Sequence, residues 1–143
     1  MATHCTLIDM QRPSMIEFGC GAVAAAARLA TARGFRRPLV VADRFNAARV
    51  DRLGLPGAVA VFGDVNPEPD IPNLEAALAM AQAIGPDLVV GFGGGSAMDI
   101  AKFVAVLPGS GQTIHDVVGA KKTKARAVAL IQIPTTSGTG SEV

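Results

Sequence analysis

Apolar runs alternate with stretches of helical periodicity along the chain. Four of these runs lack the polar alternation of a half-exposed strand, and they span residues 38–42, 58–62, 88–92 and 128–133. Continuous apolar runs are typical of strands in a parallel sheet whose two faces are both covered by helices. Together with the helical stretches between them, they predict repeated βαβ units. The expected fold class is therefore α/β, with a parallel sheet flanked by helices.

Four further stretches have the character of helices. Residues 22–33 are rich in alanine and stop at Gly34, and residues 46–53 stop before Gly54, because glycine is favoured just past a helix C-terminus. The other two helices are indicated by apolar residues that recur on one face. These stripes comprise Leu74, Leu78 and Ala81 in the third helix, which Gly85 and Pro86 end, and Ile100, Phe103, Val104 and Leu107 in the fourth, which Pro108 and Gly109 end.

The remaining segments are short. A β-hairpin is expected near the N-terminus, with residues 6–9 and 14–18 as its strands, and residues 109–124 are expected to form a polar connection on the surface. With 143 residues, half of them hydrophobic, the chain has the size of one compact domain. Because the sequence stops at Val143 inside a loop, with no further element for that loop to pack on, we expect an incomplete protein.

The overall charge does not indicate a polyanionic partner. Thirteen basic and 12 acidic residues leave a formal charge of +1, so no broad field attracts nucleic acid or an anionic membrane. The densest basic cluster comprises Lys121, Lys122, Lys124 and Arg126, and without Trp or Tyr the chain offers little for single-stranded nucleic acid to stack on. The apolar stretches fall short of the roughly 20 residues that span a bilayer. We expect neither nucleic acid nor a membrane as a partner.

The cysteines and the first residues favour a reducing cytoplasm. Cys5 and Cys20 form no CxxC pair. The opening residues 1–13 lack the basic segment and apolar run of a secretory signal.

Residues 88–102 form the most informative motif, in which a buried strand runs into three glycines and then an amphipathic helix. Gly93, Gly94 and Gly95 permit positive φ and bring backbone N–H groups close to a ligand. The helix start adds unpaired donors and a positive dipole end, so a pyrophosphate is the expected ligand. The alternative is a turn that only reverses the chain, with Ser96 as N-cap and Asp99 closing an acidic variant of the capping box.

This motif differs from the standard fingerprints. Ser96 stands at the sixth position of the glycine pattern that begins at Gly91, where the dinucleotide-binding fingerprint has Gly or Ala, and no GK[ST] follows as in a Walker loop. Asp43 ends the strand 38–42, at the edge where α/β sheets bind ligands, and a carboxylate there accepts hydrogen bonds from ribose hydroxyls and favours NAD over NADP. It precedes the glycines by about 50 residues, which is not the standard arrangement, and a turn role explains Asp43 equally well.

The segment 133–142 follows the last predicted strand and combines glycines with hydroxyl residues. Hydroxyl groups such as those of Thr135, Thr136 and Thr139 suit phosphate oxygens or a ribose. A flexible linker has the same composition.

Two of these motifs resemble the iron-containing alcohol dehydrogenase family. They are Gly-Gly-Gly-Ser-Ala-Met-Asp-Ile-Ala-Lys at 93–102 and Pro-Thr-Thr-Ser-Gly-Thr-Gly-Ser-Glu at 134–142, and residues 16–22 and 41–43 are also similar. The resemblance covers the whole chain. It implies that residues 1–143 form a Rossmann-like N-terminal dinucleotide-binding domain, lacking the family's C-terminal all-helical metal domain. It also implies an NAD-dependent enzyme that transfers hydride between the cofactor and an alcohol or aldehyde.

The resemblance further implies which residues contact NAD. Asp43 matches the family's residue at the adenosine ribose. The segment that holds the pyrophosphate and the neighbouring ribose in the family matches Gly94, Gly95, Ser96 and Asp99. Further cofactor contacts of the family match Thr135, Thr136 and Thr139. Glu68 departs from the family, because many relatives have Asn there near the cofactor, so that contact is not carried over. No catalytic residue is assigned.

The family's metal is expected outside this chain. The resemblance places its ligands, one Asp and three His, beyond Val143, and leaves the choice between iron, zinc and other divalent ions open. His4 and His115 are too few and too far apart to form that site. Relatives often pair through N-terminal strands such as 6–9, so a homodimer is expected.

Three alternatives remain at this point. The chain is also consistent with a relative that acts on glycerol or maleylacetate or performs a cyclising synthase reaction. It is consistent with a non-catalytic nucleotide-binding module, which titration with NAD and ATP would distinguish, or with a structural domain without a ligand.

Overall fold

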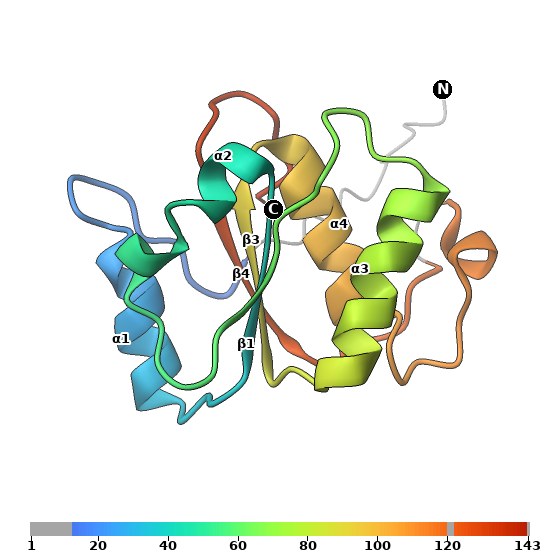
Figure 1. The fold of residues 1–143 in the computed structure, drawn as a ribbon, viewed down its shortest axis with the longest axis horizontal. Helices are drawn as coiled ribbons and strands as arrows, with labels where there is room; N and C mark the ends of the chain where they lie inside the picture. The colour runs from blue at the N-terminus through green and yellow to red at the C-terminus, as the bar shows by residue number, and fades with distance from the viewer. Residues whose placement is uncertain (1–12, 120–121, 143) are drawn as a thin grey trace, which may run out of the picture.

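The computed structural model describes residues 13–119 and 122–142, which form one open sheet between two helical layers (Figure 1). In chain order the elements are α1 (Ala24–Ala32), β1 (Pro38–Ala42), α2 (Arg44–Ala47), the 3-10 helix η1 (Val50–Leu53), β2 (Ala60–Phe62), α3 (Ile71–Ile84), β3 (Leu88–Gly93), α4 (Gly95–Val106), the 3-10 helix η2 (Ile114–Val117) and β4 (Ala129–Pro134).

The sheet is parallel throughout, in the order β2-β1-β3-β4. Every residue of β1 and β3, the two central strands, is buried, whereas β2 and β4 at the edges are partly exposed. This confirms the predicted α/β class and the predicted strands. Two of the strands are shifted slightly along the sequence, since β2 begins at Ala60 and β4 spans 129–134.

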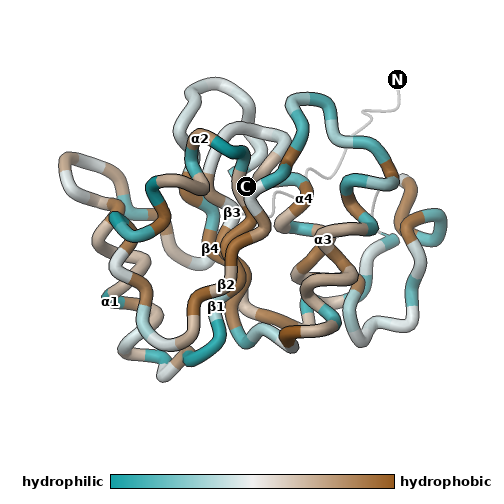
Figure 2. The backbone as a smooth tube through the Cα atoms, in the orientation of Figure 1, coloured by the Kyte–Doolittle hydropathy of each residue, from teal (hydrophilic) through white to brown (hydrophobic). Residues whose placement is uncertain are grey.

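Alternate residues of the central strands feed two hydrophobic cores. Leu39, Val41 and Val89 face α3 and α4, while Val40 and Val90 face α1, α2 and η1 on the other side. The hydrophobic centre and the paler glycine- and hydroxyl-rich loops at one end are both visible in Figure 2. Since both faces of the sheet are covered, the apolar runs need no polar alternation.

The predicted helix over 46–53 is wrong in its bounds. The chain forms two short pieces instead, α2 and η1. Asp43 caps α2 by accepting the N–H of Asn46 at 2.9 Å, so the helix begins earlier than predicted. At Arg49, φ of −120° and ψ of 7° interrupt the helical path before η1 begins.

The N-terminal hairpin is not supported where the structure describes it. Residues 14–18 form no strand, and the strand expected at 6–9 lies outside the described residues. A strand needs a partner for its backbone N–H and C=O groups, and none of the described segments pairs with 14–18. In 13–119 and 122–142, no helix is long and apolar enough to cross a membrane.

Asp87 ties two loops together at the end of the sheet where the strands begin. Its carboxylate accepts the backbone N–H groups of Arg36 and Arg37 at 2.8 and 2.9 Å. Desolvation raises the pKa of Asp87, but these two hydrogen bonds and the nearby Arg37 charge outweigh it, so the pKa lies below its ordinary value of 3.8.

Asp87→Asn is expected to lower the free energy of unfolding by about 1 kcal/mol at pH 7, because the amide accepts only one of the two N–H groups. A carboxylate with a depressed folded-state pKa stabilises fully above its unfolded pKa, and its contribution is lost as pH falls through the folded value. The difference between variant and wild type should therefore shrink below about pH 3.8. Urea unfolding from pH 7 to 3 measures it, and a constant difference would contradict the assignment.

Candidate functional site

The strand order reverses between β1 and β3. The chain leaves β1 for β2 on one side, and after α3 it returns to β3 on the opposite side of β1. In open parallel sheets, ligands bind where the order reverses in this way, outside the carboxyl ends of the strands. Asp43 follows β1 at this point, and Gly94 follows β3.

Gly93 ends β3 beside this point of reversal. Its φ is 152°, which side chains rarely tolerate, and a Cβ there would lie 3.0 Å from both Asp43 Oδ2 and Ala97 Cβ. The turn therefore passes directly against the end of β1. The strand end, the turn and the start of α4 are packed without space for a side chain.

The start of α4 is not capped as the chain-reversal alternative requires. Gly94 is the N-cap, and no side chain in the described part of the chain caps this end. Ser96 lies inside the first turn and Asp99 is exposed, 3.7 Å from Lys102 Nζ. The capping box of Ser96 and Asp99 is therefore wrong, because a side chain inside the first turn cannot reach back as an N-cap does. By contrast, α3 is capped by Asp70, which accepts the N–H of Asn73.

Ser96 fastens a neighbouring loop. Its Oγ donates to the carbonyl oxygen of Pro67 at 2.6 Å, which holds the loop between β2 and α3 against α4. The loop is also attached to β1, where the N–H of Val65 donates to the carbonyl of Ala42 at 3.2 Å, and to α3, where Asn73 Nδ2 donates to the carbonyl of Asp64. These hydrogen bonds hold the β2–α3 loop in one position beside the glycine turn.

Ser96→Ala should make the β2–α3 loop more mobile around Pro67, because it removes the hydrogen bond to the Pro67 carbonyl. The variant loses one partly exposed hydrogen bond, so we expect about 1 kcal/mol lower stability. Hydrogen exchange at Asn66 and Glu68 should increase relative to exchange in β1. Equal exchange in wild type and variant would show that the bond does not hold the loop.

Asp43 and Thr135 form a polar cluster around the buried Asn46, and the sequence pattern did not reveal all of it. Asn46, only 5% exposed, donates from Nδ2 to Asp43 Oδ2 at 2.7 Å and to Thr135 Oγ1 at 3.5 Å. Asn46 thereby connects the ends of β1 and β4 across β3. The spacing of three residues between Asp43 and Asn46 is the signal of an N-cap and could have indicated it.

The hydroxyl-rich loop after β4 lies against the glycine turn. The N–H of Thr135 donates to the carbonyl of Gly93 at 2.8 Å. A Cβ on Gly94 would lie 3.4 Å from Thr136 Oγ1, and one on Gly95 would lie 3.5 Å from Thr139 Cβ. Because the loop continues directly from β4 and makes these contacts, it is not a flexible linker.

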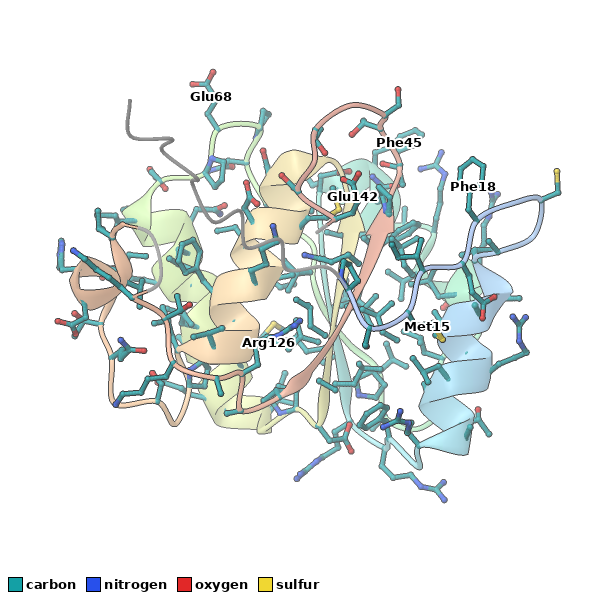
Figure 3. The ribbon with its side chains drawn as sticks, turned by 180° about the vertical axis from the view of Figure 1, so that it is seen from behind. Met15, Phe18, Phe45, Glu68, Arg126 and Glu142 are labelled. Carbon is teal, nitrogen blue, oxygen red and sulfur yellow. The ribbon has the colours of Figure 1, made fainter. Side chains whose placement is uncertain are left out.

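The structure thus brings seven of the eight predicted site residues to one end of the sheet. These are Asp43, Gly94, Gly95, Ser96, Thr135, Thr136 and Thr139. Asp99 lies one turn further along α4, paired with Lys102. Glu68, at the tip of the β2–α3 loop, points away from the body of the protein (Figure 3).

The described residues do not fit a divalent metal centre. Within 13–119 and 122–142, no three His, Cys, Asp or Glu side chains gather closely enough to hold one. His115 is exposed on η2, and His4 lies outside these ranges. The groups at the carboxyl ends of β1, β3 and β4 instead suit an anion and a ribose, since they comprise backbone N–H groups, hydroxyls and one carboxylate.

Comparison with known proteins decides the family. Residues 13–143 match the family described as iron-containing alcohol dehydrogenase. The chain belongs to this family. Alcohol dehydrogenase 4 of Saccharomyces cerevisiae is 34% identical over 142 residues, which cover 92% of this chain and 36% of the yeast protein. Long-chain-alcohol dehydrogenase 1 of Geobacillus thermodenitrificans is 46% identical over 89 residues, or 60% of this chain and 22% of that protein.

The structure also resembles a solved structure over nearly the whole chain. Sulfoacetaldehyde reductase from Bifidobacterium kashiwanohense, in complex with NAD+, is 34% identical and aligns with a TM-score of 0.83. The alignment covers 96% of this chain and 38% of that protein. The chain therefore spans little more than a third of the length of these relatives.

Proposed function

We propose that residues 1–143 are the dinucleotide-binding domain of an NAD-dependent alcohol dehydrogenase that interconverts an alcohol and an aldehyde. The observation that carries the proposal is the uncapped glycine turn at the start of α4. Gly94 and Gly95 leave their N–H groups and the positive end of the helix dipole open beside three threonines. A diphosphate bound here accepts hydrogen bonds from backbone N–H groups that no side chain occupies.

Asp43 supports NAD as the dinucleotide. Both of its carboxylate oxygens accept hydrogen bonds from Asn46, which fixes their orientation, and each oxygen keeps a further lone pair for a ribose hydroxyl. The negative charge disfavours a 2′-phosphate. The threonine side chains of 135, 136 and 139 would donate to phosphate or ribose oxygens from the other side.

When bound, the cofactor would accept hydride during alcohol oxidation in its oxidised form and donate hydride during aldehyde reduction in its reduced form. The residues of this chain bind and orient the dinucleotide; they supply no acid, base or metal ligand to the reaction. The metal of the full-length enzyme, iron or zinc, would be bound by the all-helical domain that the resemblance implies, and the binding roles of residues 1–143 do not depend on it. We accordingly expect no alcohol oxidation by the 143-residue chain alone. We also place the enzyme in the cytoplasm as a homodimer.

Calorimetric titration of the chain with NAD, NADP and ATP tests the proposal. We expect NAD to bind most tightly, NADP to bind more weakly because of Asp43, and ATP to bind more weakly than NAD. Asp43→Asn removes the charge and keeps the shape of the side chain, so it should reduce the difference in affinity between NAD and NADP. Binding of ATP as tight as that of NAD would favour a non-catalytic nucleotide module, and no binding of any nucleotide would favour a structural domain.

A further inference from the structure

Gln132 is a polar side chain held between β4 and α4. It lies in the middle of β4 among apolar residues, directly opposite Gly91 of β3 in the parallel register. Its Nε2 donates to the carbonyl oxygen of Met98 at 2.9 Å. Met98 lies in the first turn of α4 and is fully buried.

Gly91 provides the space that this amide occupies. A Cβ at Gly91 would lie 2.0 Å from Gln132 Oε1 and 3.2 Å from Cδ, so no larger residue fits there while the amide keeps its place. The same Cβ would lie 3.0 Å from Ala101 Cβ of α4. The small residues Gly91 and Ala101 thus form the slot that the Gln132 amide fills.

The amide connects the two segments that carry the proposed cofactor contacts. Gln132 lies on β4, three residues before Thr135 of the following loop, and Met98 lies on α4, three residues after Gly95. The hydrogen bond between Gln132 and Met98 therefore fixes the start of α4, with its open N–H groups, relative to the loop that carries the threonines. A second bond nearby, from the Thr135 N–H to the carbonyl of Gly93, joins the same loop to the end of β3.

The arrangement contributes little to stability. Within the described chain, Gln132 Oε1 is cut off from solvent and has no hydrogen-bond partner. A buried acceptor without a donor costs free energy, which offsets the gain from the bond to Met98. An apolar side chain of the same length would avoid this cost, so the advantage of glutamine lies elsewhere.

We propose that Gln132 is a positioning residue of the cofactor site, which sets the glycine turn of α4 at the distance from the threonine loop that a dinucleotide diphosphate requires. This inference rests on the proposed NAD site. Gln132 acts through Met98 and Gly95 and does not itself contact the ligand.

Gln132→Met tests the proposal, because methionine has a similar length and no hydrogen-bonding amide. We expect the urea midpoint to stay the same or rise. Affinity for NAD and for ADP should fall about tenfold, because the glycine turn loses the hydrogen bond that positions it. Affinity for adenosine, which lacks the diphosphate, should not change. Gln132→Ala serves as a second variant with a smaller side chain. Gln82→Met on the exposed surface of α3 is the matched control and should change neither property.

Three outcomes would overturn the proposal. They are unchanged NAD affinity in both Gln132 variants, an equal loss for adenosine and ADP, and loss of the folded state in either variant, which would make Gln132 a residue of stability. Failure of wild type to bind NAD would instead contradict the proposed function itself.

Discussion

Replacing Gly94 with Asp is expected to abolish dinucleotide binding while leaving the fold at least as stable. Gly94 is the N-cap of α4 with φ of −81° and ψ of −171°, an extended conformation that aspartate adopts readily. Aspartate is a better N-cap than glycine, so we expect a gain of about 0.5 kcal/mol in the free energy of unfolding. The same carboxylate would take the N–H groups proposed for the diphosphate and repel it, which should weaken NAD binding by more than about 100-fold.

Gly94→Asn is the matched control for this substitution. Asparagine caps a helix about as well and has the same shape, but it carries no charge. NAD affinity in this variant should lie between those of wild type and Gly94→Asp, and the stabilities of the two variants should be similar. If Gly94→Asp bound NAD as tightly as wild type, the diphosphate would have to bind elsewhere.

Gly93→Ala is expected to give the largest loss of stability. The native turn holds this position at φ of 152°, which an alanine side chain disfavours, and the added methyl group would lie 3.0 Å from Asp43 Oδ2 and from Ala97 Cβ. Strain and overpacking together should cost about 3 kcal/mol, or roughly 10 °C in the thermal midpoint. Since the turn must move to relieve the contacts, NAD binding should be lost as well. Thermal unfolding followed by circular dichroism measures the first effect.

Gly85→Ala separates strain from crowding. Gly85 is the C-cap of α3 with φ of 60°, and a Cβ there would meet no other described atom within 4 Å. Only the left-handed conformation should cost free energy, about 1 kcal/mol. An equal loss at positions 93 and 85 would contradict the close packing of the glycine turn against Asp43.

The sheet could be predicted from the sequence because its physical cause is local and continuous. A strand buried on both faces must be apolar throughout, and the runs at 38–42 and 88–92 match β1 and β3 closely. The ends of the helices were predictable where glycine marks them, as at Gly54 and Gly85, both left-handed in the structure. The split between α2 and η1 was not, because it depends on a cap at Asp43 and a backbone turn at Arg49 that periodicity does not show.

The site was predictable in its residues but not in its connections. The glycines and threonines stand out by composition, and parallel strands bring their carboxyl ends to one edge. The roles of Asn46, Ser96 and Gln132 depend on partners 29 to 89 residues away in the sequence, namely Thr135, the Pro67 carbonyl and the Met98 carbonyl. Such long-range hydrogen bonds leave no periodic signal. Ser96 was therefore predicted as a cofactor contact, with a capping role as the alternative, but its bond to the Pro67 carbonyl was not foreseen, and Asn46 and Gln132 were overlooked.

A nuclear magnetic resonance titration of the 15N-labelled chain with NAD and with inorganic pyrophosphate tests the diphosphate site at the glycine turn directly. We predict that both ligands shift the backbone N–H signals of Gly94, Gly95 and Ser96 most strongly, and that only NAD also shifts those near Asp43. Saturable binding of NAD that leaves the signals of these three residues unchanged would contradict this prediction.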